Sequence, residues 1–319
     1  MKSIRVFLFL LGPIFFILFL QNCRNNPEPF FVDKEVIDEI KMGIEEEAIL
    51  YEVKDDISIE SYFTWIESLC TFYNSEGIQA LGYQLIPQVL IHHNPWIIDS
   101  FRKSDYYLQK EVGNFQYDQR KQVIIPKGSV LSIPGKEEAQ KIDIFLASIS
   151  IDINIPEYKL RLLADQKEIF SFLIRVGQNR TKFLTSEGRD FDLRTKTGKG
   201  KIADIILSPK YTNFNTGEVY EFTRRDDKIT TLMPLIPTLE PEINGICYGQ
   251  LIHPTTNPNT LGKAYSHGCI GTREEDAWIL FFYSRIGTPI EIRYSLEIEN
   301  GVGEIQELED IYDLRSQGL

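Results

Sequence analysis

Hydrophobic and polar residues alternate along the second half of the chain, and this pattern predicts strands. Ile151, Ile153 and Ile155 are separated by Asp152 and Asn154, which is the period of two expected of a half-buried strand. Further β-rich runs, separated by polar turn residues, extend the pattern over 159–163, 169–176, 202–207, 250–253 and 289–294. We therefore predict a mostly β fold for this half of the chain.

One segment of the same half has helical spacing instead. Its residues recur at intervals of three or four, at Ala277, Leu280, Phe281 and Ser284. The spacing predicts a helix over 273–286 that begins just after Gly271 and stops before Gly287.

The first half of the chain is less regular. Residues 24–60 are rich in Glu, Asp and Asn and carry an apolar stripe at helical spacing, through Val36, Ile37, Ile40, Ile44 and Ile49. This composition predicts an acidic tether with one helix, and the alternative is the first helix of the next domain. Residues 61–135 mix helical and strand patterns, the run 136–138 predicts a linker, and residues 297–319 form an acidic tail that we expect to be peripheral.

Three runs within 61–135 together resemble a lysin motif, a small sugar-binding module of cell-wall proteins: 62–65, 93–97 and 123–134. The segment is longer than such modules because of the insertion 98–122. The resemblance implies a small α+β domain that binds the glycan strands of peptidoglycan, and the alternative is an unrelated spacer domain. His92 and His93 have no sequence partner that would make them ligands, so we expect structural roles for both.

Length and charge narrow the classes of function. A chain of 319 residues is long for one domain, so we expect about two units. The net charge of −12 argues against a nucleic-acid partner, because phosphate binding needs clustered Lys and Arg.

Residues 1–23 have the pattern of an export signal. A basic start, Met1–Arg5, precedes the apolar run Val6–Leu20, which is shorter than the ~20 residues that span a bilayer. The run ends before Cys23 in a sequence that resembles a bacterial lipoprotein cleavage site. We expect an exported protein of the periplasm or cell envelope that meets the membrane only through this signal or a lipid on Cys23. Ordinary cleavage and an uncleaved anchor are the alternatives.

Three cysteines remain after the signal, Cys70, Cys247 and Cys269. An odd number in an oxidising compartment leaves at least one thiol unpaired or paired between molecules, and a catalytic role for Cys269 would explain this. Cys70 and Cys247 either form a disulfide or are free thiols, a choice that the sequence leaves open.

The surroundings of Cys269 suggest a nucleophile. His253 and His267 are the two histidines of the β-rich half, and either supplies a base that activates a thiol. Gly268 permits a sharp turn in which backbone N–H groups near Gly268 and Cys269 converge as an oxyanion hole. The helix predicted after Gly271 and the charge of Arg273 are expected to favour the thiolate.

Ile252-His253 followed by Ser266-His267-Gly268-Cys269-Ile270 resembles the signature of the L,D-transpeptidase catalytic domain. The likeness spans about 150 residues, from the Ile151 strand through Arg175–Gln178 to Ile292. It implies a β-sandwich or barrel-like domain over 148–296, with a helix after the nucleophile, that acts on peptidoglycan stem peptides without a cofactor. It also implies that His253 is the base and that His267 lines the site. Ser266, Gly268, Tyr265 and Arg273 are then expected to contact substrate.

Two residues depart from the family pattern. Pro254 stands where Gly or Ser often follows the first His, and Gly271 stands where Arg or Asn is common two positions after the Cys. We expect the Pro254 carbonyl to orient the imidazole and Arg273 to take the place of the missing arginine.

Other interpretations compete with a transpeptidase. The acyl acceptor would decide between 3→3 crosslinks, attachment of a protein to the wall and L,D-carboxypeptidase activity. A wall-binding lipoprotein without catalysis is a further alternative. A zinc site at His253, His267 and Cys269 lacks a fourth ligand at the usual spacing, so we expect no metal. A papain-like peptidase would place its Cys before its His, whereas His253 precedes Cys269 in this chain.

Overall fold

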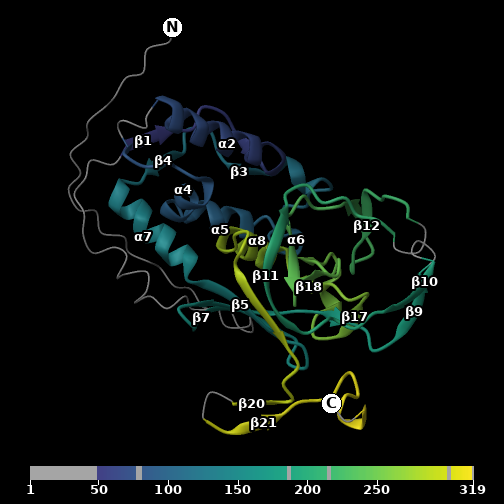
Figure 1. The fold of residues 1–319 in the computed structure, drawn as a ribbon. Coiled ribbons are helices and arrows are strands. Elements are labelled where there is room, and N and C mark those ends of the chain that lie inside the picture. The colour runs from purple at the N-terminus through teal and green to yellow at the C-terminus, as the bar shows by residue number, and fades with distance from the viewer. Residues whose placement is uncertain (1–48, 77–80, 185–187, 214–216, 300–302, 318–319) are drawn as a thin grey trace. The chain divides into compact units, whose positions relative to one another are not determined.

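The computed structural model describes residues 49–76, 81–184, 188–213, 217–299 and 303–317 (Figure 1). The predicted signal over 1–23, Cys23 and most of the predicted 24–60 tether lie outside these residues. None of the helices in the described ranges is long and apolar enough to cross a membrane.

The fold is mostly β, as predicted, and it is built on one mixed nine-stranded sheet. Along the sheet the strands are β18 (Ile270–Thr272), β16 (Ile252–Pro254), β14 (Thr238–Ile243), β11 (Gly198–Ile206), β19 (Pro289–Arg293), β5 (Ile149–Asn154), β6 (Lys159–Ala164) and β7 (Lys167–Leu173), with β15 (Ile246–Cys247) beside β14. The pairs β16–β18 and β19–β5 are parallel. Ile149, Ile151 and Ile153 all point into the core, because alternate side chains of a strand face the same side.

The two edges of this sheet meet at one residue pair. Strand β7 is one edge and β18 the other, and Arg175, just beyond β7, forms an antiparallel bridge with Gly271 of β18. Both hydrogen bonds of the bridge are made, with N···O distances of 2.9 and 3.0 Å. Strand β8 (Val176–Gly177) then pairs with β17 (Ala264–Ser266). The sheet is therefore nearly closed into a barrel.

Helix α8 (Glu274–Tyr283) is the predicted helix: it begins one residue after the predicted start at 273 and ends three residues before the predicted end at 286. Strand β18 stands between Cys269 and α8, so the helix does not follow the thiol directly. Nearly the whole circumference of α8 is buried, as expected of a helix that is hydrophobic all round. Trp278 and Phe282 pack into one core, whereas Ile279 and Leu280 pack against the sheet.

Residues 49–147 form short strand pairs and helices around the first of these cores. The elements are β1 (Ile49–Glu52), β2 (Ile57–Ser58), α2 (Ile59–Glu76), α4 (Pro87–His93), α5 (Trp96–Arg102), α6 (Tyr106–Glu111), the 3-10 turn η1 (Gln119–Lys121), β3 (Val123–Ile125), β4 (Val130–Ile133) and α7 (Lys136–Ala147). Strand β1 pairs with β4, and β2 pairs with β3. The lysin-motif resemblance of 61–135 stays a prediction.

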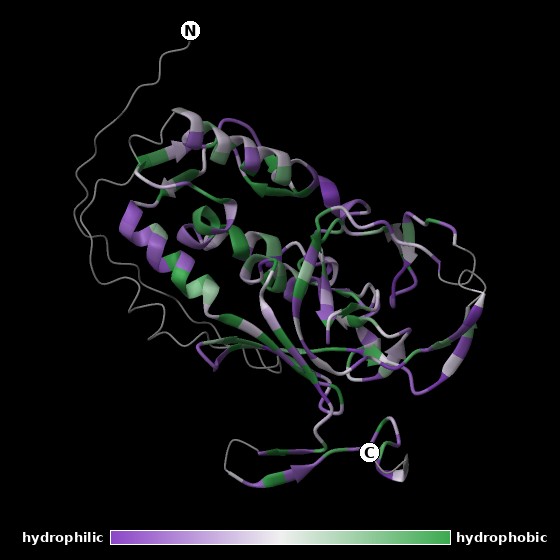
Figure 2. Ribbon diagram, in the orientation of Figure 1, coloured by the Kyte–Doolittle hydropathy of each residue, from purple (hydrophilic) through white to green (hydrophobic). Residues whose placement is uncertain are grey.

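Two predicted boundaries in this half are wrong. Residues 49–60 are not tether, because β1 and β2 pair with strands at the far end of the segment. Residues 136–138 are not a linker but the first turn of α7, whose polar start and apolar end are visible in Figure 2. The apolar end is buried through Ile142 and Leu146. The linker prediction considered only the charged first turn and therefore missed the helix.

The remaining elements are small hairpins and one turn: β9 (Thr181–Leu184) with β10 (Arg189–Asp192), β12 (Phe222–Arg224) with β13 (Thr230–Leu232), β20 (Glu297–Glu299) with β21 (Ile305–Glu307), and the 3-10 turns η2 (Pro258–Thr260) and η3 (Arg315–Gln317). The acidic tail is not wholly peripheral. Tyr312 is 2% exposed, and its hydroxyl donates to the Gly177 carbonyl and accepts from the Thr195 N–H.

Candidate active site

Cys269 ends a tight turn between β17 and β18. Gly268 has a φ of +111°, a conformation that side chains rarely adopt. A Cβ at this position would lie 2.4 Å from Nε2 of Gln250. The prediction that Gly268 permits the turn before the thiol is therefore confirmed, and packing against Gln250 adds a second reason for the glycine.

The Ser266 hydroxyl closes this turn. It donates to the Cys269 carbonyl at 2.5 Å and accepts from the Gly268 N–H at 3.1 Å. The Gly268 N–H is thus already engaged, so it does not serve as the oxyanion donor that the sequence suggested. Ser266 was expected to contact substrate, but its hydroxyl has both of these partners inside the turn. The Thr195 hydroxyl also contacts the turn and donates to the Gly268 carbonyl at 2.9 Å.

His253 lies on the strand beside the nucleophile. In the parallel pair of β16 and β18, His253 is opposite Gly271, and the Ile270 N–H donates to the Leu251 carbonyl. Nδ1 of His253 is 2.8 Å from the Pro254 carbonyl. A carbonyl only accepts, so Nδ1 carries the proton and Nε2 keeps its lone pair when the ring is neutral. This contact matches the expectation for Pro254.

Burial keeps both candidate groups neutral at rest. Burial, followed by the nearby charge of Arg175, lowers the pKa of His253 to about 4. Burial also raises the pKa of the Cys269 thiol above its usual value, against the opposing effects of a backbone hydrogen bond from Leu251 and of Arg175. Sγ of Cys269 lies 3.9 Å from the Gly249 carbonyl. At rest the two groups are therefore a thiol and a neutral imidazole, the protonation states that a nucleophile and its general base start from.

The cation that acts on the thiol is Arg175, not Arg273. Arg175 influences the pKa values of Cys269, His253 and His267, whereas Arg273 precedes α8 as its exposed N-cap residue. Strand β18 stands between Cys269 and α8, so the helix does not follow the thiol directly, and the expected contribution of its N-terminus stays a prediction. The sequence did not indicate Arg175 as a site residue. The one signal was the absence of a side chain at Gly271, because another side chain fills that space.

His267 and Tyr265 flank the turn on its outer side. His267 is half-buried, and burial, followed by the charges of Lys182 and Arg180, lowers its pKa. The Tyr265 side chain is 58% exposed, and its carbonyl accepts from the Gln178 amide. The predicted contacts of His267 and Tyr265 with substrate stay a prediction.

Comparison with known families identifies this part of the chain. Residues 148–292 match the profile of the YkuD family, the L,D-transpeptidase catalytic domain. This segment belongs to that family. The predicted family and barrel-like fold are therefore confirmed for the part of the chain that carries Cys269 and His253.

Solved structures similar to the L,D-transpeptidase domain are distant in sequence. An L,D-transpeptidase from Mycobacterium smegmatis is 15% identical, with 46% of this chain and 58% of that chain covered and a TM-score of 0.32. One from Xylanimonas cellulosilytica is 13% identical, covers 65% and 94%, and has a TM-score of 0.34. L,D-transpeptidase 3 from Mycobacterium tuberculosis, solved with a faropenem-derived adduct, is 17% identical, covers 46% and 60%, and has a TM-score of 0.30. The match thus spans less than two thirds of the first and third of these chains. A search of the curated proteins gave no match.

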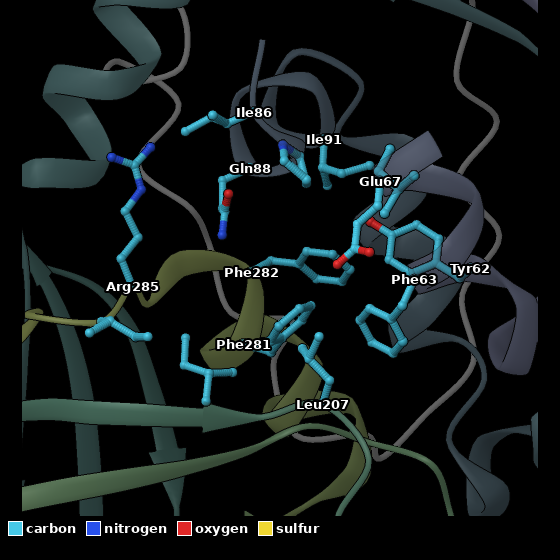
Figure 3. A pocket seen from close by; sticks show the side chains of 14 residues that line it. Tyr62, Phe63, Glu67, Ile86, Gln88, Ile91, Leu207, Phe281, Phe282 and Arg285 are labelled. Carbon is cyan, nitrogen blue, oxygen red and sulfur yellow. The ribbon is translucent and has the colours of Figure 1, made fainter. Parts of the chain in front are cut away.

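A cavity elsewhere in the molecule is separate from the candidate active site. It has a volume of about 400 Å³ and is lined mainly by apolar side chains, among them Tyr62 and Phe63 of α2 and Phe281 and Phe282 of α8 (Figure 3). Neither Cys269 nor His253 lines it. Within the described ranges, no group of three or more His, Cys, Asp or Glu side chains is placed to hold a metal ion.

The other described cysteines and histidines differ in burial and contacts. Cys70 is buried and Cys247 exposed, and neither is in a disulfide with another described cysteine. His92 contacts the Phe282 carbonyl through Nε2 at 2.9 Å, and His93 contacts the Ser132 hydroxyl at 3.1 Å. These contacts agree with the structural roles expected for both histidines.

Proposed function

We propose that this protein is a peptidoglycan L,D-transpeptidase in which Cys269 is the nucleophile and His253 the general base. The observation that supports this most is the pairing of β16 with β18. It sets the imidazole, with Nε2 unprotonated, on the strand next to the thiol. A base and a nucleophile oriented by a third group are the arrangement that activates a thiol.

In the first half-reaction, the sulfur attacks the carbonyl between the third residue and the terminal D-alanine of a stem peptide. The C–S bond forms as Nε2 of His253 takes the thiol proton. The C–N bond then breaks, and the imidazolium gives this proton to the amine of the departing D-alanine. The Cys269 N–H is the backbone donor proposed to stabilise the oxyanion, since the Gly268 N–H is bound to Ser266.

In the second half-reaction, an acceptor amine attacks the thioester and restores the thiol. The proton of the amine passes to His253 and then to the departing sulfur. A side-chain amine of a second stem as acceptor gives a 3→3 crosslink. Water would give a carboxypeptidase, and a protein lysine would give a wall anchor.

Acylation by a carbapenem tests the nucleophile directly. Intact-mass spectrometry of the protein treated with imipenem is expected to show one added drug mass, and Cys269→Ala is expected to show none. Cys70→Ala is the matched control, because it removes a buried thiol outside the site and should acylate like the parent. Absence of an adduct on the parent, or an adduct that survives Cys269→Ala, would overturn the proposed nucleophile.

We also propose that the protein acts outside the cytoplasm, where its substrate is found. The basic and apolar pattern of residues 1–23 supports export. Mass spectrometry of the mature N-terminus distinguishes a lipidated Cys23 from simple cleavage, and recovery of the full-length chain in the cytoplasm would contradict export.

A further inference from the structure

Arg175 is a largely buried cation for which no described residue supplies an ion pair. Its side chain makes one hydrogen bond, from Nη1 to the Thr260 hydroxyl at 3.2 Å. Its Nε is buried and has no partner among the described atoms, and no carboxylate of the described residues lies within salt-bridge distance of it. Burying a charge without pairing it costs free energy, so a guanidinium held in this way points to an absent anionic partner.

The barrel seam places this guanidinium beside the reacting atoms. Arg175 is opposite Gly271, and Gly271 is opposite His253 on its other side. Directly opposed residues point to the same face of a sheet, as do residues two apart on one strand. Arg175 and His253 therefore point to the same face as Gly271, and the charge of Arg175 also acts on Cys269, the residue just before β18.

Gly271 makes room for the arginine. A Cβ at Gly271 would lie 2.5 Å from Nε, 2.8 Å from Cγ and 3.0 Å from Cδ of Arg175. The Arg175 side chain thus lies across the glycine and occupies the volume that a side chain at 271 would take. Arg175 reaches the site because residue 271 is a glycine and not the Arg or Asn that is common at this position of the family pattern.

We propose that Arg175 binds the terminal carboxylate of the donor stem peptide and so selects donors whose scissile bond precedes a C-terminal residue. This inference rests on the proposed function. Standard bond lengths put the carboxylate carbon of that residue within about 4 Å of the attacked carbonyl carbon. The bound carboxylate must therefore lie next to Cys269, and Arg175 is the cation whose charge acts on that residue. Guanidinium and carboxylate groups match geometrically through paired hydrogen bonds.

The test compares two donors that differ in one group: a tetrapeptide stem with a free C-terminal carboxylate and the same peptide with a C-terminal amide. For Arg175→Met, we expect kcat/KM for the free carboxylate donor to fall about 10- to 100-fold, as for the loss of a charged hydrogen bond, mainly through KM. The parent should use the amide donor poorly, and Arg175→Met should use that donor almost as well as the parent does. Arg224→Met, which removes an exposed cation of β12, is the matched control and should behave like the parent.

A relocated arginine separates recognition from structural support. The double variant Arg175→Ala with Gly271→Arg should recover part of the preference for the free carboxylate, because it returns a guanidinium to the same space. Equal losses on both donors in Arg175→Met, at unchanged iodoacetamide labelling of Cys269, would overturn the carboxylate role and leave the proposed function standing. Failure of the parent to turn over either donor or to form a carbapenem adduct would instead contradict the proposed function.

Discussion

The imidazole of His253 is set in one tautomer by its own chain. The Pro254 carbonyl accepts the proton of Nδ1, so the nitrogen left for catalysis is Nε2. Sequence reasoning reached this contact because it joins adjacent residues. It did not reach Arg175, because the contact between Arg175 and Gly271 joins segments that only the closed sheet brings together.

The lowered pKa of His253 predicts an unusual acid limit for acylation. An imidazole with the ordinary pKa of ~6.5 loses most of its neutral form by pH 5.5. With a pKa of about 4, His253 stays neutral there, and the raised pKa of Cys269 keeps the thiol protonated well above pH 7. The second-order rate of carbapenem acylation should therefore be nearly constant from about pH 5 to 8.

Stopped-flow or timed mass spectrometry across this range measures the profile, with circular dichroism as the control for folding. A rate that halves near pH 6.5 would show that the base titrates as an exposed histidine does. A rate that rises tenfold per pH unit through the whole range would show that only a small thiolate fraction reacts.

At the scale of elements, a buried ion pair connects α8 to three other parts of the chain. Arg225 and Glu274 are 2.7 Å apart with side chains 0% and 2% exposed. Glu274 also accepts from the Tyr106 N–H and the Gln119 amide, while Arg225 lies 4.0 Å from the centre of the Tyr106 ring. This network joins α8, α6, η1 and the turn between β12 and β13.

Removing one partner of this pair should be strongly destabilising. For Glu274→Ala, we expect the free energy of unfolding to fall by about 3 to 5 kcal/mol, because Arg225 is left buried and unpaired. Glu291→Ala is the matched control: its partner Lys199 is 78% exposed, and such surface pairs contribute about 0 to 1 kcal/mol. Urea unfolding curves measure both, and equal losses would show that the buried network has no special role.

At the scale of the whole molecule, the predicted catalytic domain has its own core against the sheet but also contributes one side of α8 to the core of the first half. Trp278 and Phe282 of α8 are packed with Tyr62 and Phe101 of the first half. Only the other side of α8 packs on the sheet. The boundary predicted at residue 148 therefore cuts through the hydrophobic core that α8 shares with the first half of the chain.

We expect a fragment of residues 148–319 not to fold on its own. Exposing Trp278 and Phe282 would cost about 1.5 to 3 kcal/mol each, and Arg225 would lose Gln119 as well, against a net stability of about 5 to 15 kcal/mol for a typical protein. Residues 49–319 should unfold in one cooperative transition, whereas the fragment should bind a hydrophobic dye and lack near-UV circular dichroism. A cooperative unfolding transition of the fragment alone would contradict the shared core.

The sequence by itself determined most strands of the sheet, though not β14, β15 or β18, together with the helix before Gly287, the turn at Gly268 and the candidate pair of Cys269 and His253. Each depends on neighbouring residues: a period of two or of 3.6, a glycine before a thiol, or a motif within a short run. The export signal and Cys23 also come from sequence alone and remain predictions.

Only the tertiary structure decided which cation faces the thiol and which cores α8 packs into. Arg175 reaches the site because the edges of the sheet close at Gly271. Tyr312 of the acidic tail supports Thr195 beneath the turn. Such contacts join residues far apart in the chain, and their partners are selected by strand order and packing, which no local pattern encodes.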